Sequence, residues 1–342
     1  MKNRVITVIG SISESSFIKS DINILQKHCK VYSVNTTGSL NKSKLKKYIQ
    51  YLQLGFNIIF KAIPLILISD SVLIWFADLH AVIPIIIARI FQKQCVVVIG
   101  GYEVSNMPEI NYGKMREPLT WRGNICKWVI NHSDACIVPS QSYYDKTLRY
   151  IKDKNKLYIS PCCVKSYLPL TLRHYMKKDI VLMVAQSDIK NYLLKDIPSF
   201  NNAAGKIKNA SFYIIGRYDK EISDKYNNIK YLGLISHEEV LYWMNLSKVY
   251  CQISKTESFG ISILESISAG CIPIITNVDN LPLLIDDNGI VINSIDELIP
   301  AINISLSKSQ YNLHIKISNN AIIKIQKFCK MRENTLKKLL GV

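Results

Sequence analysis

Short apolar runs alternate with helix-like stretches along both halves of the chain, and this alternation limits the fold more than any other feature. Parallel α/β sheets produce it, because strands buried on both faces read as apolar runs joined by helices. The first half gives predicted strands at Val5 to Ile9, Val31 to Val34, Val72 to Trp75, Val96 to Ile99 and Cys136 to Val138. The second half gives Ile180 to Ala185, Ser211 to Ile215, Ile229 to Leu232, Val249 to Ile253, Ile272 to Thr276 and Ile290 to Ile292.

Helices are predicted between the strands of the first half, at Phe17 to His28, Lys44 to Lys61, Ala81 to Phe91 and Gln141 to Tyr150. The stretch from Leu54 to Phe76 is apolar enough to suggest a membrane span. However, Lys61, Pro64 and Asp70 divide it into pieces shorter than the roughly 20 residues that a span needs. We therefore expect a helix, a turn and then a buried strand.

The alternation is interrupted between Pro161 and Pro169 and begins again at Ile180. A chain of 342 residues is also too long for one ordinary core, so two domains are expected. We predict a Rossmann-like domain at 1–168, a second at 169–325, and a C-terminal helix at 326–342 that packs back on the N-terminal domain. Two doubly wound domains of this kind would face each other across a cleft at the carboxyl ends of their strands.

The composition favours an anionic partner, because 43 Lys and Arg against 26 Asp and Glu leave a net charge of +17. No stacked-aromatic platform or recognition motif for nucleic acid is present, so nucleic acid is not expected. The nine cysteines lie mostly inside apolar runs, and the six histidines are not near them at ligand spacing. This predicts buried thiols in a reducing compartment and no metal site. The first residues form no signal peptide, so a cytoplasmic location is expected.

The segment KTESFGISILESISAGCIPIIT, residues 255–276, follows the predicted strand Val249 to Ile253. The next helix should begin at Phe259 or Gly260, where free backbone N–H groups can hold a phosphate. Glu257 lies before this helix start and Glu265 lies eight residues later, so carboxylates can accept hydroxyl hydrogen bonds on both sides of the phosphate. A nucleotide sugar, with hydroxylated rings at both ends of a diphosphate, fits that arrangement.

The same segment resembles the family 4 glycosyltransferases, which have two Rossmann-like domains in the arrangement called GT-B. Their signature is two glutamates separated by seven residues, with Phe-Gly after the first and a Gly-x-Pro turn after the second, as in Ser268 to Pro273. The resemblance implies that Glu257 contacts the donor sugar and that Glu265 contacts the ribose. It also implies that the backbone of Ser258, Phe259, Gly260 and Ile261 holds the sugar and phosphate.

Other parts of the second half are similar to this family. Phe212 to Gly216 resembles its strand and glycine near the nucleotide, and Tyr231 to Gly233 followed by Ser236 to Val240 resembles its base-side loop and helix. The family's arginine after the first strand of this domain is missing at Gln186. Lys195 is the best match for the family's lysine that neutralises the departing diphosphate, and Lys190 is a second candidate cation.

The first half matches the family less specifically. Glu103, in a Gly-Gly-Tyr-Glu sequence, stands where many relatives carry a histidine near the reacting sugar, and it is a candidate catalytic residue. His80 and His237 have structural alternatives, His80 as a satisfied buried histidine and His237 as a residue at a helix start. The loop from Gly10 to Ser16 lacks the usual paired glycines, which indicates an acceptor side different from that of the family.

The segment Lys42 to Phe60 combines a lysine-rich start with aromatic and apolar residues. It is either a core-facing helix with a solvated basic end or a helix that rests on anionic lipid. The second alternative suits an enzyme with a membrane-bound acceptor, peripheral on the inner face of the membrane.

The resemblance implies a retaining glycosyltransferase, of the hexosyltransferase type, that moves a sugar from a nucleotide-sugar donor to a glycan or lipid-linked acceptor. Cell-surface polysaccharide or glycolipid synthesis would be its setting. Glu257, Lys195 and Glu103 are the catalytic candidates. No Asp-x-Asp metal motif follows a strand, so metal independence is expected, with no cofactor besides the donor substrate. Three alternatives stay open: a nucleotide-sugar epimerase or phosphorylase of the same plan, a nucleic-acid-binding protein that would explain the charge, or a non-catalytic nucleotide-sugar-binding protein.

Overall fold

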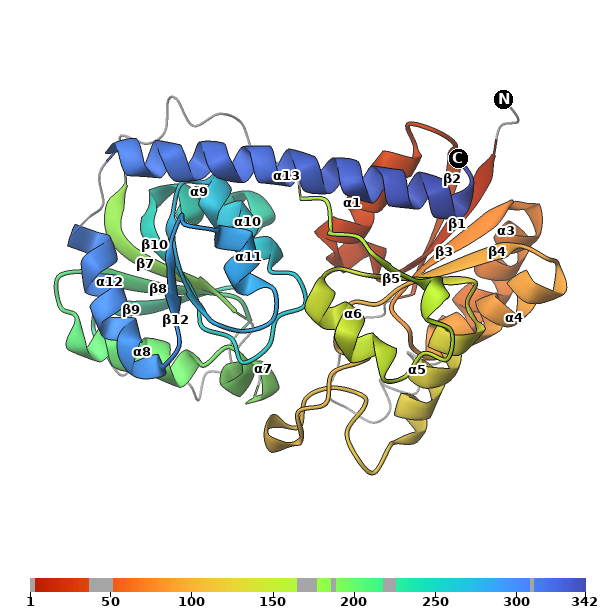
Figure 1. Ribbon diagram of the computed structural model, residues 1–342, viewed down its shortest axis with the longest axis horizontal. Coiled ribbons are helices and arrows are strands. Elements are labelled where there is room, and N and C mark those ends of the chain that lie inside the picture. The colour runs from red at the N-terminus through yellow and green to blue at the C-terminus, as the bar shows by residue number, and fades with distance from the viewer. Residues whose placement is uncertain (1–3, 37–51, 165–176, 186–188, 218–225, 308–310) are drawn as a thin grey trace. The chain divides into compact units, whose positions relative to one another are not determined.

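The computed structural model describes residues 4–36, 52–164, 177–185, 189–217, 226–307 and 311–342 (Figure 1). The chain divides into two compact units. The N-terminal unit contains Met1–Cys163 and Phe328–Val342, and the C-terminal unit contains Val164–Lys327. Within the described residues, each unit is built on one parallel sheet of six strands. The predicted α/β class with two Rossmann-like sheets is therefore confirmed.

The sheet of the N-terminal unit has the strand order β2-β1-β3-β4-β5-β6, and every neighbouring pair is parallel. Its strands are β1 (Val5–Gly10), β2 (Lys30–Asn35), β3 (Ser71–Trp75), β4 (Gln94–Val98), β5 (Ala135–Val138) and β6 (Leu157–Ile159). The five predicted strands lie within two residues of those observed. The edge strand β6 was not predicted, because three residues are too few to show a pattern.

Helices connect these strands and bury their apolar sides against the sheet. They are α1 (Ser16–Leu25), the π-helix η2 (Asn57–Ala62), α3 (Ile63–Ile68), α4 (Val82–Ile90), α5 (Trp121–His132) and α6 (Gln141–Leu148), with short 3₁₀ turns η1 (Ile12–Glu14), η3 (Leu79–Ala81), η4 (Pro108–Ile110) and η5 (Lys154–Lys156). Pro64 does not interrupt the helix as expected, since η2 runs directly into α3 with Pro64 in the first turn of α3. Proline is tolerated there because the first N–H groups of an α-helix lack intrahelical partners.

The sheet of the C-terminal unit has the order β12-β11-β10-β7-β8-β9, again with parallel neighbours. The strands are β7 (Lys178–Val184), β8 (Ser211–Ile215), β9 (Ile229–Gly233), β10 (Ser247–Gln252), β11 (Ile272–Thr276) and β12 (Ile290–Ile292). All six were predicted. The chain starts in the middle of the sheet at β7, builds outward to β9, and returns to β10 on the other side of β7. This reversal is the switch point at which doubly wound sheets bind ligands.

The helices of the C-terminal unit cover its sheet around a separate apolar core. They are α7 (Ile189–Leu194), α8 (Ile197–Lys206), α9 (His237–Leu246), α10 (Ile261–Ser268), α11 (Leu281–Ile285), the 3₁₀ turn η8 (Ile295–Glu297), α12 (Leu298–Ser307) and α13 (Tyr311–Leu340). The helix α13 contributes to both units, since residues up to Lys327 belong to the C-terminal unit and those from Phe328 belong to the N-terminal unit.

The end of α13 is fastened within the N-terminal unit by a buried ion pair and a disulfide. The guanidinium of Arg332 donates to both carboxylate oxygens of Asp21, at 2.9 and 2.6 Å. Cys163 and Cys329 form a disulfide across 166 residues of sequence. The prediction of free thiols is wrong for these two cysteines, because nothing in the sequence indicates that residues so far apart meet. The other seven cysteines are free, and six of them are buried, as expected.

Of the helices in the described ranges, none is both long and apolar enough to cross a membrane.

Candidate functional site

The loop between β10 and α10 lies at the carboxyl end of a switch-point strand, and this loop and α10 together carry six of the ten predicted site residues. The helix α10 begins at Ile261 rather than at Phe259 or Gly260, and Gly260 is its N-cap. Gly260 has φ of +85°, a backbone conformation that residues with a Cβ rarely adopt. A Cβ at this position would also lie 2.8 Å from Leu284 Cδ1. The turn that starts α10 therefore requires glycine.

Glu257 and Lys195, two of the catalytic candidates, lie together in the C-terminal unit. The Lys195 Nζ is 2.6 Å from Glu257 Oε2, and both side chains are mostly buried. Lys195 follows α7, whose end is attached to the loop by a hydrogen bond from Lys255 N to Leu194 O of 2.8 Å. Residues 62 positions apart in the sequence thus form one charged pair at the carboxyl edge of the sheet.

Three polar residues that the sequence analysis did not select hold Glu257 in place. Gln252, the last residue of β10, donates from Nε2 to Glu257 Oε2 at 2.8 Å. The hydroxyl of Tyr250 donates to Gln252 Oε1 at 2.9 Å, and burial raises the pKa of Tyr250 well above its usual value. Asp279 accepts a hydrogen bond from Glu257 N at 2.9 Å and another from Thr256 Oγ1. The carboxylate is therefore positioned before any ligand arrives.

Glu265, the second glutamate of the motif, lies on α10 and is only 6% exposed. Its Oε1 is 2.8 Å from Nε2 of His237, the first residue of α9. The start of α9 is fixed by a capping box between Ser236 and Glu239, so the backbone places His237 beside Glu265. The glutamate that was predicted to contact the ribose is thus already oriented by a histidine from another helix.

The remaining predicted binding residues lie along the same edge of the C-terminal sheet. Gly216 follows β8, has φ of +143°, and donates from its N–H to Gly233 O at 3.0 Å. Phe259 is buried, whereas Ser258 and Ile261 are half-buried. Lys190 belongs to α7, but its side chain lies outside the described part of the structure. Gln186, where the family's arginine is missing, also lies outside the described residues.

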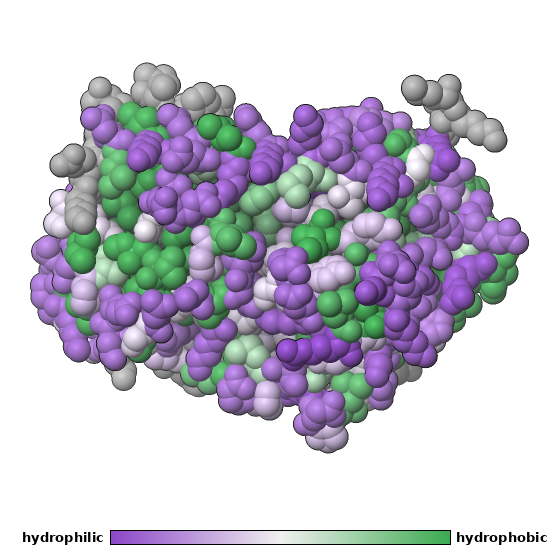
Figure 2. Space-filling model, in the orientation of Figure 1, coloured by the Kyte–Doolittle hydropathy of each residue, from purple (hydrophilic) through white to green (hydrophobic). Residues whose placement is uncertain are grey.

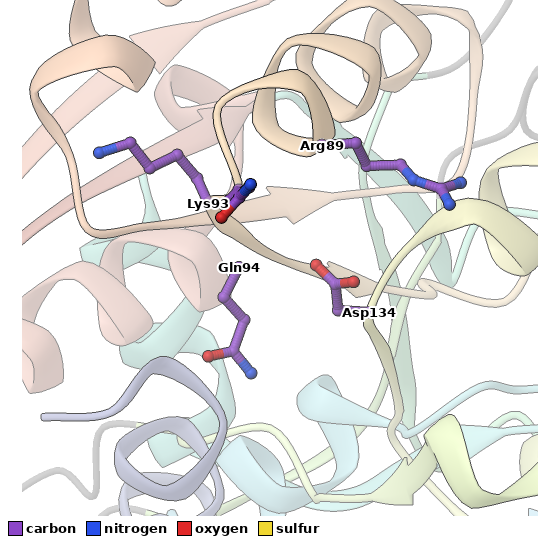
Figure 3. Close-up of a pocket in the computed structure, with 5 residues that line it drawn as sticks. Arg89, Lys93, Gln94 and Asp134 are labelled. Carbon is purple, nitrogen blue, oxygen red and sulfur yellow. The ribbon is translucent and has the colours of Figure 1, made fainter.

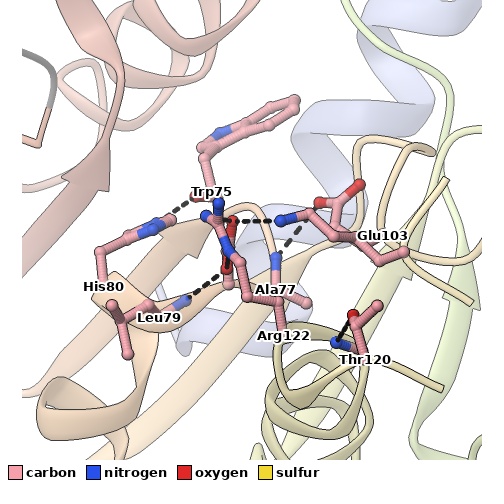
Figure 4. Close-up of polar contacts among 10 residues, drawn as sticks. Trp75, Ala77, Leu79, His80, Glu103, Thr120 and Arg122 are labelled. Carbon is pink, nitrogen blue, oxygen red and sulfur yellow. Dashed lines mark hydrogen bonds and ion pairs between the residues drawn. The ribbon is translucent and has the colours of Figure 1, made fainter. Parts of the chain in front are cut away.

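Glu103, the candidate from the N-terminal unit, is buried against backbone rather than presented as a free carboxylate (Figure 4). Its Oε1 accepts hydrogen bonds from Ala77 N and Gly100 N, at 3.2 and 3.1 Å, and its Oε2 accepts one from Gly101 N at 2.8 Å. Burial raises the pKa of Glu103, and the backbone hydrogen bonds oppose that rise. In this arrangement, the carboxylate holds two loops that follow β3 and β4.

His80 lies near this cluster, with its ring pointing back toward β3 (Figure 4). Its Nε2 lies 2.8 Å from Trp75 O, and burial lowers the pKa of the imidazole, which favours a neutral ring. The neighbouring Asp78 pairs with Lys114 and Arg122. Burial alone would raise the pKa of Asp78, but these two cations and a backbone hydrogen bond lower it. The geometry matches the structural alternative for His80.

Comparison with solved structures identifies the fold. The likeness runs over nearly the whole chain. HepE (Alr3699) from Anabaena, solved with UDP and glucose, is 14% identical to this chain, with a TM-score of 0.70. The match covers 99% of this chain and 100% of HepE. Sucrose-phosphate synthase from Thermosynechococcus elongatus is 16% identical, with a TM-score of 0.72 and 98% coverage of each chain. WaaG, a glycosyltransferase involved in lipopolysaccharide biosynthesis, is 14% identical, with a TM-score of 0.67 and 99% and 100% coverage. The chain has the GT-B fold.

Comparison with protein families then places the chain more closely. A model of the glycosyl transferases group 1 matches residues 171–324, which contain both glutamates of the motif and Lys195. No curated protein sequence matches the chain. Residues 171–324 thus match the glycosyl transferases group 1, and the resemblance predicted from the sequence is confirmed for this part of the chain.

Proposed function

We propose that the protein is a retaining glycosyltransferase that transfers a sugar, of the hexose type, from a nucleotide-sugar donor to a glycan or lipid-linked acceptor. The observation that carries the proposal is the pair of ordered carboxylates, Glu257 with Lys195 and Glu265 with His237, on either side of the start of α10. HepE, which has the same fold, was solved with UDP and glucose and with UDP-glucose, and this supports a nucleotide-sugar donor.

In the proposed complex, the donor diphosphate lies at the start of α10, where backbone N–H groups favour negative charge. Charge on this group grows as the bond to the sugar breaks, so a cation at the same place stabilises the transition state more than the ground state. Lys195 supplies that cation. Lys195 is paired with Glu257 in the structure, and this pairing keeps its ammonium oriented. The incoming diphosphate therefore either takes the place of Glu257 at the ammonium or shares the ammonium with it.

The two glutamates then have separate tasks. Glu257, held by Lys195, Gln252 and its own backbone contact to Asp279, accepts hydrogen bonds from hydroxyls of the donor sugar. Glu265, held by His237, accepts hydrogen bonds from the ribose hydroxyls. Glu103 takes part through the two loops it holds, one at Ala77 after β3 and one at Gly100 and Gly101 after β4, rather than as a free base. No residue of the proposed set requires a metal ion.

A thermal-shift panel of UDP, GDP and ADP sugars tests the donor. One nucleotide class should raise the melting temperature, and Glu265→Gln should weaken that ligand's affinity by roughly 10- to 150-fold, since a hydrogen bond to a charged group contributes about 1.5–3 kcal/mol. Glu238→Gln, which removes an exposed carboxylate on α9, is the matched control and should leave the affinity unchanged. A protein that responds to none of the three classes would count heavily against the proposed nucleotide-sugar donor.

Product analysis tests the reaction itself. Incubation with the stabilising donor and a lipid or glycan extract should give a product with the donor's anomeric configuration, and Lys195→Ala should lower its rate of formation by about 100-fold or more. Lys206→Ala, at the exposed end of α8, is the control. Conversion of the donor to a different nucleotide sugar without acceptor would assign the site to an epimerase instead.

The proposed setting is the cytoplasmic face of a membrane that carries the acceptor, in the synthesis of a surface polysaccharide or glycolipid. The lysine-rich start of the segment Lys42 to Phe60 lies outside the described residues. Its described part, from Leu52, exposes Leu52, Phe56 and Phe60, which supports contact with an apolar surface.

A further inference from the structure

Exposed large apolar side chains are concentrated in one part of the N-terminal unit. Of the 21 in the described residues, ten lie between positions 52 and 91. Six of them define what we call the apolar face: Phe56, Ile59 and Phe60 at η2, and Ile83, Ile86 and Ile90 on α4. Their exposed fractions run from 39% to 65%. Scattered exposed apolar residues are ordinary, but a contiguous group of this kind marks an interaction surface.

Helical spacing and packing place these side chains on one surface. Ile83, Ile86 and Ile90 are three and four residues apart and share one side of α4, while Ile85 and Ala88 on its other side are buried in the core. The rings of Phe56 and Phe60 are in contact, with centroids 4.7 Å apart. The helices η2 and α3 pack against α4, and Figure 1 shows α3 and α4 together at the end of the unit.

Where Figure 1 places α3 and α4, the space-filling view has green apolar areas among the purple ones (Figure 2). The surface is therefore mixed, with apolar side chains next to charged ones.

A basic pocket adjoins the end of this face. It has a volume of about 470 Å³ and is lined by Arg89, Gln92, Lys93, Gln94 and Asp134 (Figure 3). Arg89 precedes Ile90 in α4, and Lys93 follows just after the helix. The carboxylate of Asp134 is engaged by a 2.8 Å hydrogen bond from Cys95 N. Two cations against one carboxylate leave the pocket with a net positive charge, and two glutamines add amide donors.

We infer that the apolar face and this pocket together form the surface by which the protein rests on a lipid bilayer with anionic headgroups. Side chains such as Phe60 and Ile90 enter the boundary between headgroups and acyl chains, and Arg89 and Lys93 contact lipid phosphates. This inference rests on the proposed function, which includes a membrane-bound acceptor. It deepens that function by adding α4 and the basic pocket to the surface that contacts the membrane.

Charge distinguishes a membrane from the other occupants of such a face. In a symmetric dimer formed through this face, the same patch meets itself, so Arg89 and Lys93 of one copy would lie close to those of the other and repel them. An anionic bilayer satisfies the apolar and the basic parts at once, and the net charge of +17 favours it over a neutral surface. The inner leaflet of a cell membrane has this chemistry.

Vesicle co-sedimentation of the full chain tests the inference. We expect binding to phosphatidylcholine vesicles that contain phosphatidylglycerol, much weaker binding to phosphatidylcholine alone, and loss of binding as salt is raised. The double variant Phe60→Asp/Ile90→Asp should lower partitioning more than tenfold. Arg89→Gln and Lys93→Gln should each lower it about fivefold, the amount expected for one cation at an anionic surface.

Two control variants remove comparable groups elsewhere. Ile323→Asp changes an exposed apolar residue of α13, and Lys316→Gln changes an exposed lysine of the same helix, and both should leave partitioning unchanged. Absence of vesicle binding, or equal binding by the double variant, overturns the inference. So does a dimer in analytical ultracentrifugation that the double variant converts to monomers, since the face would then bind a second copy.

Donor thermal shifts on the same preparations separate this inference from the proposed function. Vesicle binding without a donor response would refute the glycosyltransferase proposal alone. A donor response without vesicle binding would refute the membrane surface alone.

Discussion

Asp21→Asn is expected to destabilise the N-terminal unit more than any single change at its surface. The side chain of Arg332 is 1% exposed and that of Asp21 is 2% exposed. Asp21 Oδ2 also accepts a hydrogen bond from Trp75 Nε1 at 3.0 Å, and the guanidinium lies 5.3 Å from the centre of the Trp75 ring. The substitution keeps the shape and the acceptor for Trp75, but it leaves the charge of Arg332 buried without a counterion.

Removing one partner of a buried ion pair typically costs about 3–5 kcal/mol, because the other charge stays desolvated. For a unit of this size each kcal/mol shifts the melting temperature by about 2–4 °C, so a fall of roughly 6–20 °C is expected. The double variant Asp21→Asn/Arg332→Met removes the buried charge altogether. It should therefore be more stable than Asp21→Asn alone, within about 2 kcal/mol of the starting protein.

Urea unfolding followed by tryptophan fluorescence measures these differences, since Trp75 lies in the cluster. The control is Glu333→Gln on the same helix, which removes the negative charge from the partly exposed contact between His28 Nε2 and Glu333 Oε1 and should lower the unfolding free energy by less than about 1 kcal/mol. The reasoning is refuted if Asp21→Asn costs no more than this control, or if the double variant is as unstable as the sum of its single changes.

Three further results are expected. Gly260→Ala should lower the free energy of unfolding by about 1–3 kcal/mol and weaken donor affinity, because φ is +85° at this position. Gly55→Ala is the control, since a Cβ there meets no neighbour within 4 Å, and equal melting temperatures of the two variants would contradict the prediction. Burial holds the pKa of His80 below 6.5, so the unfolded chain binds the proton more readily and the free energy of unfolding should fall as pH drops below about 6.5. Urea midpoints measured across this pH range should depend less on pH in His80→Gln. Cys163→Ser should lower the unfolding free energy by about 2–4 kcal/mol without reductant, and a loss unchanged by reductant would argue against the disulfide.

The strands were the most predictable part of the fold. A strand buried on both faces needs an unbroken apolar run, so β3 and β11 are visible in sequence as stretches such as Val72 to Trp75. Helix ends were less predictable. The start of α10 shifts to Ile261 because Gly260 takes a left-handed conformation, which no local pattern reveals.

The site was predictable only where its residues are close in sequence. Glu257 and Glu265 stand out because strand, glycine turn and helix follow one another within one segment. Gln252 and Asp279 were missed, since a polar residue at the end of a strand or in a loop gives no signal until its partner is known.

The amino-acid sequence by itself determined the alternation of strands and helices and the spacing of the two glutamates, because both follow from contacts between near neighbours in the chain. Only the tertiary structure decided which side chains meet: Lys195 with Glu257, His237 with Glu265, and Asp21 with Arg332, at separations of 62, 28 and 311 residues. Such pairings depend on the order of strands in each sheet, and that order brings distant segments to the same edge.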